Sequence, residues 1–518
     1  MPIWCKHSTQ AVTTGDRNRA GDINHLRLDT GRNMTVSGQV CIRDIEDLHI
    51  GSIDLSGVPA GVTAEHHFRD NIYFNDGIPY PDILTHRDAM TVKAHVAQVL
   101  LVTFRVDADA TPGTYRIELV MKTQHGTCGA IFTLVIHEAV LPDPKDSAFF
   151  HEYMFNYDGH FSFGDYTPKA TPFPDCPRYS EGWWSLMAAY AREMKALRCN
   201  VLNLNPLALL GDSGSRRISP TEWTFDYTLL DRFIDICLTH GSFRMIAMSS
   251  IINSVEGKFI HAIDEKGRNC RIDIFTPEAN AWFEAVFGGI YRHFEAKGWL
   301  SMLAMRLEDE PHTTEYWKWA RALCRRLLPG IPCGEPLDMH ASSMDLVGEC
   351  DQYIPRLDVY AEDPAFYRRR QAAGDQVWCY SCCYPEEPEW LNKFMDRPVI
   401  HSRLMYWACY AQGITGFLHW GLNHWTVEGY GMIPEARFKG DGFIIYPDTE
   451  HTDVKPSIRG VASREGLQDV ELLYLLEKKY PFMAKAIAAR IARSFTDYTL
   501  DEGEVDRCRA EMLTILDR

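Results

Sequence analysis

The chain lacks the hydrophobic segments that membrane and secreted proteins carry. No apolar run approaches the ~18–20 residues that are needed to span a bilayer. The N-terminus, MPIWCKHSTQ, contains no basic segment followed by an apolar run, which is the pattern of a secretory signal. We therefore expect no membrane insertion, and we expect a cytoplasmic protein.

Basic residues are also scarce relative to acidic ones. The sequence contains 53 Lys and Arg against 70 Asp and Glu, a formal net charge of −17, and no block of Lys and Arg. Nucleic acids and anionic membranes bind to a basic face, so the charge balance argues against both as partners. A neutral substrate fits this charge balance better, while the oligomeric state is left open.

A disulfide framework is missing as well. The 15 cysteines are odd in number and are scattered from Cys5 to Cys508, unlike the paired cysteines of small secreted domains. Cys379, Cys382 and Cys383 lie close together, but no second cysteine pair completes a zinc site. We expect buried thiols in a reducing compartment.

Residues 1–142 are β-rich. Between 101 and 136, apolar residues such as Phe104 and Val106 alternate with polar ones, and turn residues occur at 111–113 and 124–126. Alternation with a period of two is typical of half-buried strands. These short strands predict an N-terminal antiparallel β-sandwich domain, which ends at the Pro/Asp linker Leu141–Pro144.

Strand-like runs alternate with amphipathic helical stretches after the linker, and we count eight such runs. The strand candidates are 148–154, 200–205, 244–250, 303–308, 337–341, 357–361, 376–382 and 414–421. The helical candidates include 183–197, 226–240, 277–296, 314–328, 364–373 and 389–412. This pattern predicts an α/β fold, a (β/α)₈ TIM barrel over 145–460, followed by a helical segment, 461–518, packed on the barrel.

A barrel of this kind has its active site at the carboxyl ends of its strands. Polar and aromatic side chains are predicted at this rim, and such a set suits a sugar, whose ring stacks on aromatics while its hydroxyls need polar partners. The candidate substrate-binding residues are Asn203, Asn205, His340, Tyr360, Trp378, Tyr380, Trp420, Asn423, Trp425 and Asp441. Core packing or loop-structural roles remain the alternative for each of them.

The fourth strand candidate runs into three consecutive acidic residues, Glu308, Asp309 and Glu310, followed by Pro311. Strand alternation directs Arg306 and Glu308 into the barrel, where we expect them to form an ion pair. Glu310 lies beyond the strand end in the same register, and the following proline predicts an extended conformation for it. Asp309 reaches the rim because the backbone turns there.

Three interpretations of this acidic run compete. A solvated charge run is the first, but the position at the end of a barrel strand argues against it. A divalent-metal site is the second, although histidines at ligand spacing are missing. The third is glycoside hydrolysis. Adjacent carboxylates fit poorly on opposite sides of a scissile bond, but they suit a substrate-assisted route in which the substrate's 2-acetamido oxygen is the nucleophile.

The sequence resembles the catalytic domain of glycoside hydrolase family 123, the β-N-acetylgalactosaminidases. The likeness covers roughly 145–480 and rests on an ordered series of segments. These are Asp309–Pro311, Val377–Tyr380, His401–Trp407, Gly413–Trp420, Gly440–Gly442, Tyr446–Pro447, Ser457–Arg459 and Arg464–Leu476.

The resemblance implies a retaining exo-enzyme that releases terminal β-linked N-acetylgalactosamine from a glycan or glycoconjugate through an oxazolinium-type intermediate, without a metal or cofactor. Asp309 would orient the acetamide and Glu310 would act as acid and then base, with its pKa raised by burial and by the charge of Asp309. A glycosidase of other sugar specificity, or a catalytically silent carbohydrate-binding protein, remains the alternative.

Overall fold

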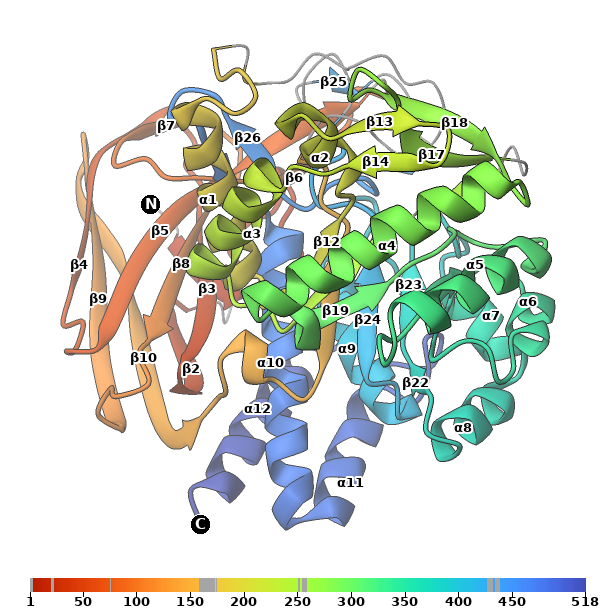
Figure 1. The fold of residues 1–518 in the computed structure, drawn as a ribbon. Coiled ribbons are helices and arrows are strands. Elements are labelled where there is room, and N and C mark those ends of the chain that lie inside the picture. Colours follow the sequence, from red (N-terminus) through yellow and green to blue (C-terminus); the bar gives the residue numbers. More distant parts are fainter. Residues whose placement is uncertain are drawn as a thin grey trace.

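The computed structural model describes residues 3–19, 23–74, 76–157, 173, 175–249, 252–253, 259–425, 432–433 and 438–518. Two β-sheets form the N-terminal part, parallel strands alternate with helices in the middle, and three helices form the C-terminal part (Figure 1). The chain is thus an α/β protein with a β-rich N-terminal region.

The two N-terminal sheets face each other across a common hydrophobic core, to which strands of both contribute. The alternation predicted between residues 101 and 136 is confirmed, since Phe104, Val106, Leu119 and Phe132 are buried. The first sheet contains β1 (Ile3–His7), β3 (Met34–Ile42), β8 (Gln98–Val106), β5 (Val62–Phe74), β6 (Pro79–Thr85) and β25 (Met432–Ile433). The second contains β2 (His25–Arg32), β10 (Gly126–Val140), β9 (Gly113–Thr123), β4 (Leu48–Ser56) and β7 (Met90–Val92). Two pairings depart from the antiparallel prediction, because β2 runs parallel to β10 and β25 runs parallel to β5.

The middle of the chain forms two sheets in which neighbouring strands are parallel. One has the order β19 (Leu303–Met305), β15 (Met245–Met248), β12 (Val201–Leu204), β11 (Phe150–Tyr153), β24 (Gly416–His419) and β23 (Cys379–Ser381). The other consists of β20 (Gly334–Leu337), β21 (Gln352–Pro355) and β22 (Gln376–Val377). Two parallel bridges connect them, Met305 with Cys333 and Arg356 with Tyr380.

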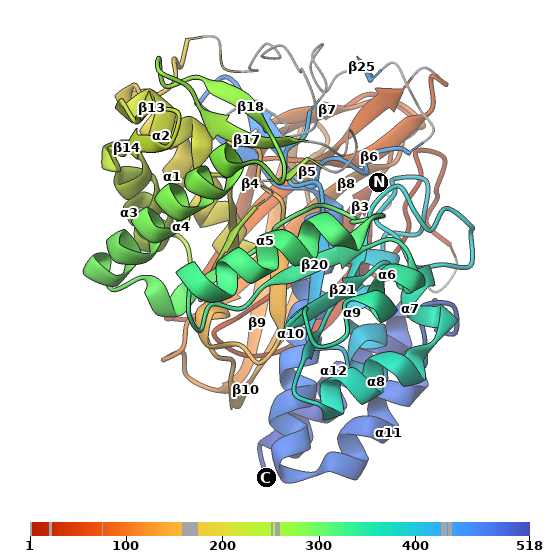
Figure 2. The same cartoon turned by 45° about the vertical axis from the view of Figure 1, so that its right-hand side comes forward.

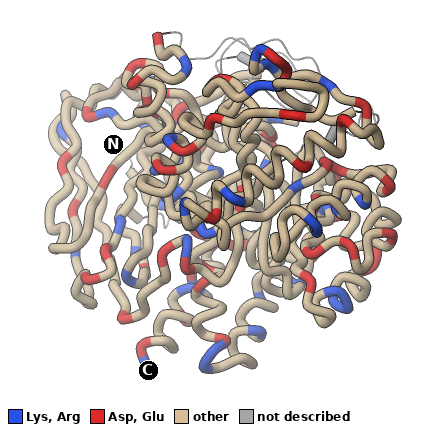
Figure 3. The backbone as a smooth tube through the Cα atoms, viewed as in Figure 1, with Lys and Arg blue, Asp and Glu red and all other residues tan. Residues whose placement is uncertain are grey.

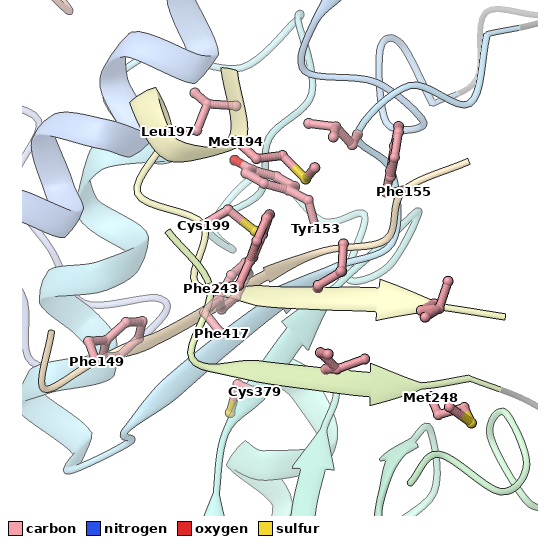
Figure 4. Packing of buried hydrophobic residues seen from close by; sticks show 14 of the residues in the cluster. Phe149, Tyr153, Phe155, Met194, Leu197, Cys199, Phe243, Met248, Cys379 and Phe417 are labelled. Carbon is pink, nitrogen blue, oxygen red and sulfur yellow. The ribbon is translucent and has the colours of Figure 1, made fainter. Parts of the chain in front are cut away.

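Helices follow these strands and cover one side of them. They are α1 (Glu181–Ala196), α2 (Leu207–Ser213), α3 (Thr228–His240), α4 (Pro277–Lys297), α5 (Thr314–Leu327), α6 (His340–Asp345), α7 (Leu357–Glu362), α8 (Pro364–Ala372) and α9 (His401–Gln412). The start of α1 is set by Ser180, whose side chain accepts a hydrogen bond from the N–H of Trp183. Figure 4 shows Met194 and Leu197, at the end of α1, beside Tyr153 of β11 in the large hydrophobic core.

The fifth and sixth strands lie earlier in the chain than predicted. Of the stretches expected as strands, 337–341 contains only the last residue of β20 and the first two of α6, and 357–361 lies within α7; the strands are β20 and β21. The sequence of β20, GEPL, contains glycine, glutamate and proline, residues that are depleted in strands. Its Glu335 is completely buried because it accepts hydrogen bonds from the N–H of Leu307 and from Nε1 of Trp317, both at 2.8 Å. The helix predicted over 389–412 begins only at His401.

The last three helices, α10 (Ile458–Lys479), α11 (Pro481–Ile491) and α12 (Glu502–Leu516), contact both the parallel-strand region and the N-terminal sheets (Figure 2). Arg403 of α9 forms a buried ion pair with Asp469 of α10 at 2.7 Å. Asp517 lies 2.7 Å from His137 of β10. The C-terminal helices therefore contact both the parallel-strand region and the N-terminal sheets, and hold the two regions together.

Smaller elements lie in the connections. They are β13 (Arg216–Ser219), β14 (Glu222–Thr224), β16 (Ile252–Asn253), β17 (Phe259–Ile263), β18 (Asn269–Asp273), β26 (Tyr446–Asp448), β27 (Asp453–Lys455) and two 3₁₀ turns, Pro144–Asp146 and Leu300–Met302. Acidic and basic residues are interspersed along the chain (Figure 3). In the described part of the chain, no helix is both long and apolar enough to cross a membrane.

Candidate active site

The acidic run begins after the end of β19, and the predicted alternation of its side chains is confirmed on one face. Leu303, Met305 and Leu307 lie in the large hydrophobic core. Arg306 points the other way, where its guanidinium lies 5.5 Å from the ring of Trp378. The carboxylate that forms the ion pair with Arg306 is that of Glu152, at 3.0 Å, whereas Glu308 was the predicted partner.

Asp309 and Glu310 are half-buried at the bend that follows β19. Glu310 has φ of +48°, so the extended conformation predicted from Pro311 is wrong. A non-glycine residue in the left-handed region carries backbone strain, and strain of this kind is concentrated at functional sites. The bend is held from outside, because the Ser342 hydroxyl donates to the carbonyl oxygen of Pro311 at 2.8 Å.

Tyr380 of β23 brings a hydroxyl to this pair. It donates a hydrogen bond to a carboxylate oxygen of Glu310. Burial raises the pKa of Glu310, and the hydrogen bond from Tyr380 counteracts part of that rise because it stabilises the ionised form. Tyr380, one of the ten predicted substrate-binding residues, thus directly contacts the acidic pair.

The pKa of Asp309 is shifted further than that of Glu310. Burial, followed by the charges of Glu310 and Asp338, raises its pKa to about 8. The two adjacent carboxyl groups titrate as a coupled pair, so at neutral pH the pair still holds a proton. This is the protonation state that an acid catalyst requires, although in the free protein the proton resides mainly on Asp309.

Two charged residues that the sequence analysis missed act on this pair. Asp338, directly after β20, raises the pKa of both Asp309 and Glu310, and its carboxylate lies 3.0 Å from Nε2 of His312. Arg356, directly after β21, lowers the pKa of Glu310. Both residues follow strands that were placed too late in the sequence, so a correct strand assignment would have identified them.

Two adjacent thiols lie on the same rim. The Sγ atoms of Cys382 and Cys383 are 4.0 Å apart, and both residues are half-buried. The hydrogen bond between the thiols lowers the pKa of Cys383 to about 7, although burial and the charge of Glu310 oppose this shift. The expectation of inert buried thiols holds for Cys379, which is fully buried, but not for this pair.

Trp420 and Asp441 form a second polar contact at the strand ends. Nε1 of Trp420 donates to Oδ2 of Asp441 at 2.6 Å. Asp441 is buried, which raises its pKa well above the usual value, and its Oδ1 accepts no hydrogen bond from any residue that the structure describes. Arg459 holds the segment by donating to the carbonyl oxygens of Gly440 and Phe443, at 2.7 and 2.8 Å.

Three predicted sugar contacts lie instead in the packed interior. Trp378 is fully buried and stacks on Phe150 with ring centroids 5.0 Å apart. Asn203 donates to Glu152 at 2.9 Å. Tyr360 lies in α7, where its hydroxyl donates to the carbonyl oxygen of Gln412 at 3.3 Å.

The other four predicted contacts hold the scaffold together. Asn205 accepts a hydrogen bond from the N–H of Leu207, at 3.1 Å, at the start of α2. The amide of Asn423 exchanges two 2.9 Å hydrogen bonds with the backbone of Asn156. Nε1 of Trp425 donates to Ile445 O at 2.9 Å. His340 begins α6 and packs edge-to-face on Phe366.

The described residues contain two groups of side chains at metal-ligand distances, and neither includes Asp309 or Glu310. The geometry therefore supports acid–base chemistry by a coupled carboxyl pair better than a metal centre. One carboxyl group can hold a hydrogen-bond donor while its neighbour transfers a proton.

Comparison with known proteins identifies a matching family and a similar solved structure. The family model described as the catalytic domain of glycoside hydrolase 123 matches residues 175–476. A solved structure described as a family 123 glycoside hydrolase from Clostridium perfringens, studied for glycolipid glycan hydrolysis, superposes with a TM-score of 0.76 at 14% identity. That match covers 100% of this chain and 96% of the other.

A β-D-glucuronidase from Dictyoglomus thermophilum overlaps less well, with a TM-score of 0.35 and 9% identity, over 81% of this chain and 68% of the other. None of the curated protein sequences matches this chain.

Proposed function

The chain belongs to glycoside hydrolase family 123, and we propose that it is a retaining exo-enzyme that releases terminal β-linked N-acetylgalactosamine. The observation that carries this proposal is the Asp309–Glu310 pair at the end of β19, with the hydroxyl of Tyr380 on Glu310. Two adjacent carboxyl groups cannot flank a glycosidic bond as nucleophile and acid, so the nucleophile is supplied by the substrate.

In the proposed reaction the 2-acetamido oxygen attacks the anomeric carbon. Asp309 accepts a hydrogen bond from the acetamide N–H and stabilises the positive charge that develops on the ring formed by the attack. Glu310 donates a proton to the leaving oxygen and then accepts one from the water that opens the intermediate. Release with retained configuration follows, because two inversions occur at the same carbon.

Substrate binding is proposed to place the proton correctly. In the free pair the pKa of Asp309 is raised to about 8, so the shared proton resides mainly there. An acetamide N–H that donates to Asp309 stabilises its ionised form and lowers its pKa. The proton is then favoured on Glu310, where the leaving oxygen requires it.

Asp441 is proposed to bind a sugar hydroxyl and Trp420 to flank the ring. The free Oδ1 of Asp441 supports this role, since a buried carboxylate oxygen without a donor is costly until a ligand supplies one. We also propose that the parallel strands close into the predicted (β/α)₈ barrel, with a sandwich domain over 1–142. The bridges Met305–Cys333 and Arg356–Tyr380 support closure, because they connect the larger parallel sheet to the residues directly before β20 and directly after β21 of the smaller one.

A substrate panel tests the proposed activity. Aryl β-N-acetylgalactosaminide, β-N-acetylglucosaminide and β-galactoside are compared with wild type, Asp309→Asn, Glu310→Gln and the control Glu315→Gln, which changes an exposed acid in the first turn of α5. We expect cleavage of the N-acetylgalactosaminide with retained configuration, and a loss of roughly 10²–10⁴-fold in Glu310→Gln. The control is expected to keep wild-type activity.

Three outcomes would contradict the proposal. Cleavage of the unacetylated galactoside alone excludes the substrate-assisted route. Preference for the N-acetylglucosaminide assigns another sugar to the same chemistry. Binding of free N-acetylgalactosamine without turnover identifies a carbohydrate-binding protein. A glycolipid glycan ending in N-acetylgalactosamine then shows whether the range reported for the Clostridium perfringens enzyme extends to this chain.

A further inference from the structure

A group of metal-ligating side chains lies in the N-terminal sheets, outside the candidate active site. It consists of His66, on β5, and of His86 and Asp88, in the connection between β6 and β7. Each residue offers one ligand atom, and these atoms all lie within 4.8 Å of one another. The proposed hydrolysis uses none of the three.

The local sequence explains how two ligands come to lie together. His86 and Asp88 are separated by one residue in a segment without regular secondary structure that leads from the first sheet to the second. In an extended chain such residues share one side, and the residue between them points away. Arg87 does so and forms an ion pair with Asp70 at 2.7 Å. Its guanidinium therefore does not neutralise the three ligands.

The distances fit a small tetrahedral ion. Oδ1 of Asp88 lies 3.6 Å from Nε2 of His66 and 3.8 Å from Nε2 of His86. Ligand atoms bound to tetrahedral zinc at about 2.0–2.1 Å are separated by roughly 3.3–3.4 Å. The side chains of His86 and Asp88 are 57% and 76% exposed, so a small rotation of each closes the remaining gap.

A hydrogen bond orients the imidazole ring of His86. Nδ1 of His86 lies 3.0 Å from the carbonyl oxygen of His66 and donates to it, which leaves the lone pair of Nε2 for an ion. Nε2 of His66 lies 3.2 Å from the carbonyl oxygen of Arg87, so binding of an ion through Nε2 requires its proton to move to Nδ1.

We propose that His66, His86 and Asp88 bind Zn²⁺, with a water molecule as the fourth ligand. Two imidazoles and a carboxylate are a donor set that zinc accepts. The ion would connect β5 to the crossover between the two N-terminal sheets, because His66 belongs to the first sheet and His86 and Asp88 to the chain leading to β7 of the second. Its role is to stabilise that crossover, independently of the hydrolytic reaction.

The second group at metal-ligand distance, Asp448, Glu450 and His451, lacks these features. Nζ of Lys455 already lies 3.3 Å from Oδ1 of Asp448, so a cation neutralises that carboxylate. This group serves as an internal comparison for the experiment, because it also has a histidine and carboxylates, but the amine of Lys455 lies where a metal ion would bind.

The test uses the untagged full chain, treated with a chelator and dialysed. Zn²⁺ binding is followed by isothermal titration calorimetry, and thermal unfolding is measured with and without Zn²⁺. We expect one ion per chain, a higher Tm with Zn²⁺, and at least a tenfold loss of affinity in both His86→Ala and Asp88→Asn. Two controls are expected to match wild type, His451→Ala and His125→Ala, the second in the exposed turn between β9 and β10.

Two results would overturn the proposal. If wild type binds no Zn²⁺, the three residues do not form a metal site. If His86→Ala binds Zn²⁺ with the stoichiometry and affinity of wild type, the ion is bound elsewhere. Glycosidase activity is measured alongside on the chelated chain, and we expect it to be unchanged, which keeps this inference separate from the proposed hydrolysis.

Discussion

The substitution Asp338→Asn tests how the acidic pair is tuned, because it removes a charge that acts on both of its members. The negative charge of Asp338 raises the pKa of Asp309 and that of Glu310. Asparagine keeps the shape of the side chain and its ability to hydrogen-bond to His312 but lacks the charge. Both pKa values of the pair are therefore expected to fall.

The size of the fall follows from the surroundings of Asp338. A like charge within about 4–6 Å shifts a carboxyl pKa by up to roughly 1–3 units in a buried site. The carboxylate of Asp338 is 17% exposed and lies 3.0 Å from the largely exposed His312, and both features weaken its field. We expect a fall of roughly 0.5–1 unit in each pKa, which corresponds to about 0.7–1.4 kcal/mol.

The measurement is the pH dependence of kcat/KM with an aryl β-N-acetylgalactosaminide. Activity requires one proton on the pair, so the acidic limb reports protonation of the carboxylate and the alkaline limb reports loss of the last proton. Since both pKa values fall, both limbs move to lower pH, and the alkaline limb starts from the Asp309 pKa of about 8.

Arg356→Gln provides the matched control with the opposite sign. The positive charge of Arg356 lowers the pKa of Glu310, so its removal moves the limb that reports Glu310 to higher pH. A profile of Asp338→Asn that is unmoved, or that moves to higher pH, would refute this electrostatic account, even if both variants remain active.

Three further outcomes follow from the same contacts. Tyr380→Phe removes the hydrogen bond that stabilises ionised Glu310, so we expect the acidic limb of kcat/KM to rise by roughly one unit, since such bonds contribute about 1.5–3 kcal/mol. Arg306→Met leaves the buried Glu152 without its cation and should lower the free energy of unfolding, measured by urea titration, by about 3–5 kcal/mol. The control Arg105→Met breaks an exposed ion pair and should lower it by less than about 1 kcal/mol. Iodoacetamide should inactivate the enzyme near neutral pH by alkylating Cys383, whose pKa is lowered to about 7. The variant Cys383→Ser should resist inactivation, and equal inactivation of this variant would show that another thiol reacts.

Periodicity in the sequence predicted most of the elements that define this fold. The strands of the hairpins between residues 98 and 140, and helices such as α4 and α5, follow from alternation and helical periodicity. The strands β20 and β21 were misplaced because their side chains do not carry the usual β signature. Glu335 and Pro336 can lie in a buried strand because the N–H of Leu307 and Nε1 of Trp317 donate hydrogen bonds to the Glu335 carboxylate.

The residues of the candidate site were likewise predicted only in part. Asp309 and Glu310 were identified from the sequence because an acidic run directly after a buried strand is typical of an active-site rim, and Tyr380 because it was predicted near the carboxyl end of a strand. Trp378, Asn203 and Tyr360 were assigned to the rim for the same reason, yet they are packed inside the protein. Local sequence indicates the end of a strand only to within a few residues, which does not decide whether a side chain reaches the rim or stays in the interior.

The sequence by itself therefore determined the family, the order of strands and helices and the acidic pair, because these depend on local patterns. Only the tertiary structure decided the state of that pair. Tyr380 lies 70 positions from Glu310 along the chain, with Asp338 and Arg356 between them, and all three act on the pair because separate strand ends meet at one place. The φ of +48° at Glu310 belongs to the bend that the fold imposes there, and the pKa of about 8 at Asp309 arises from burial and from charges brought together by the fold.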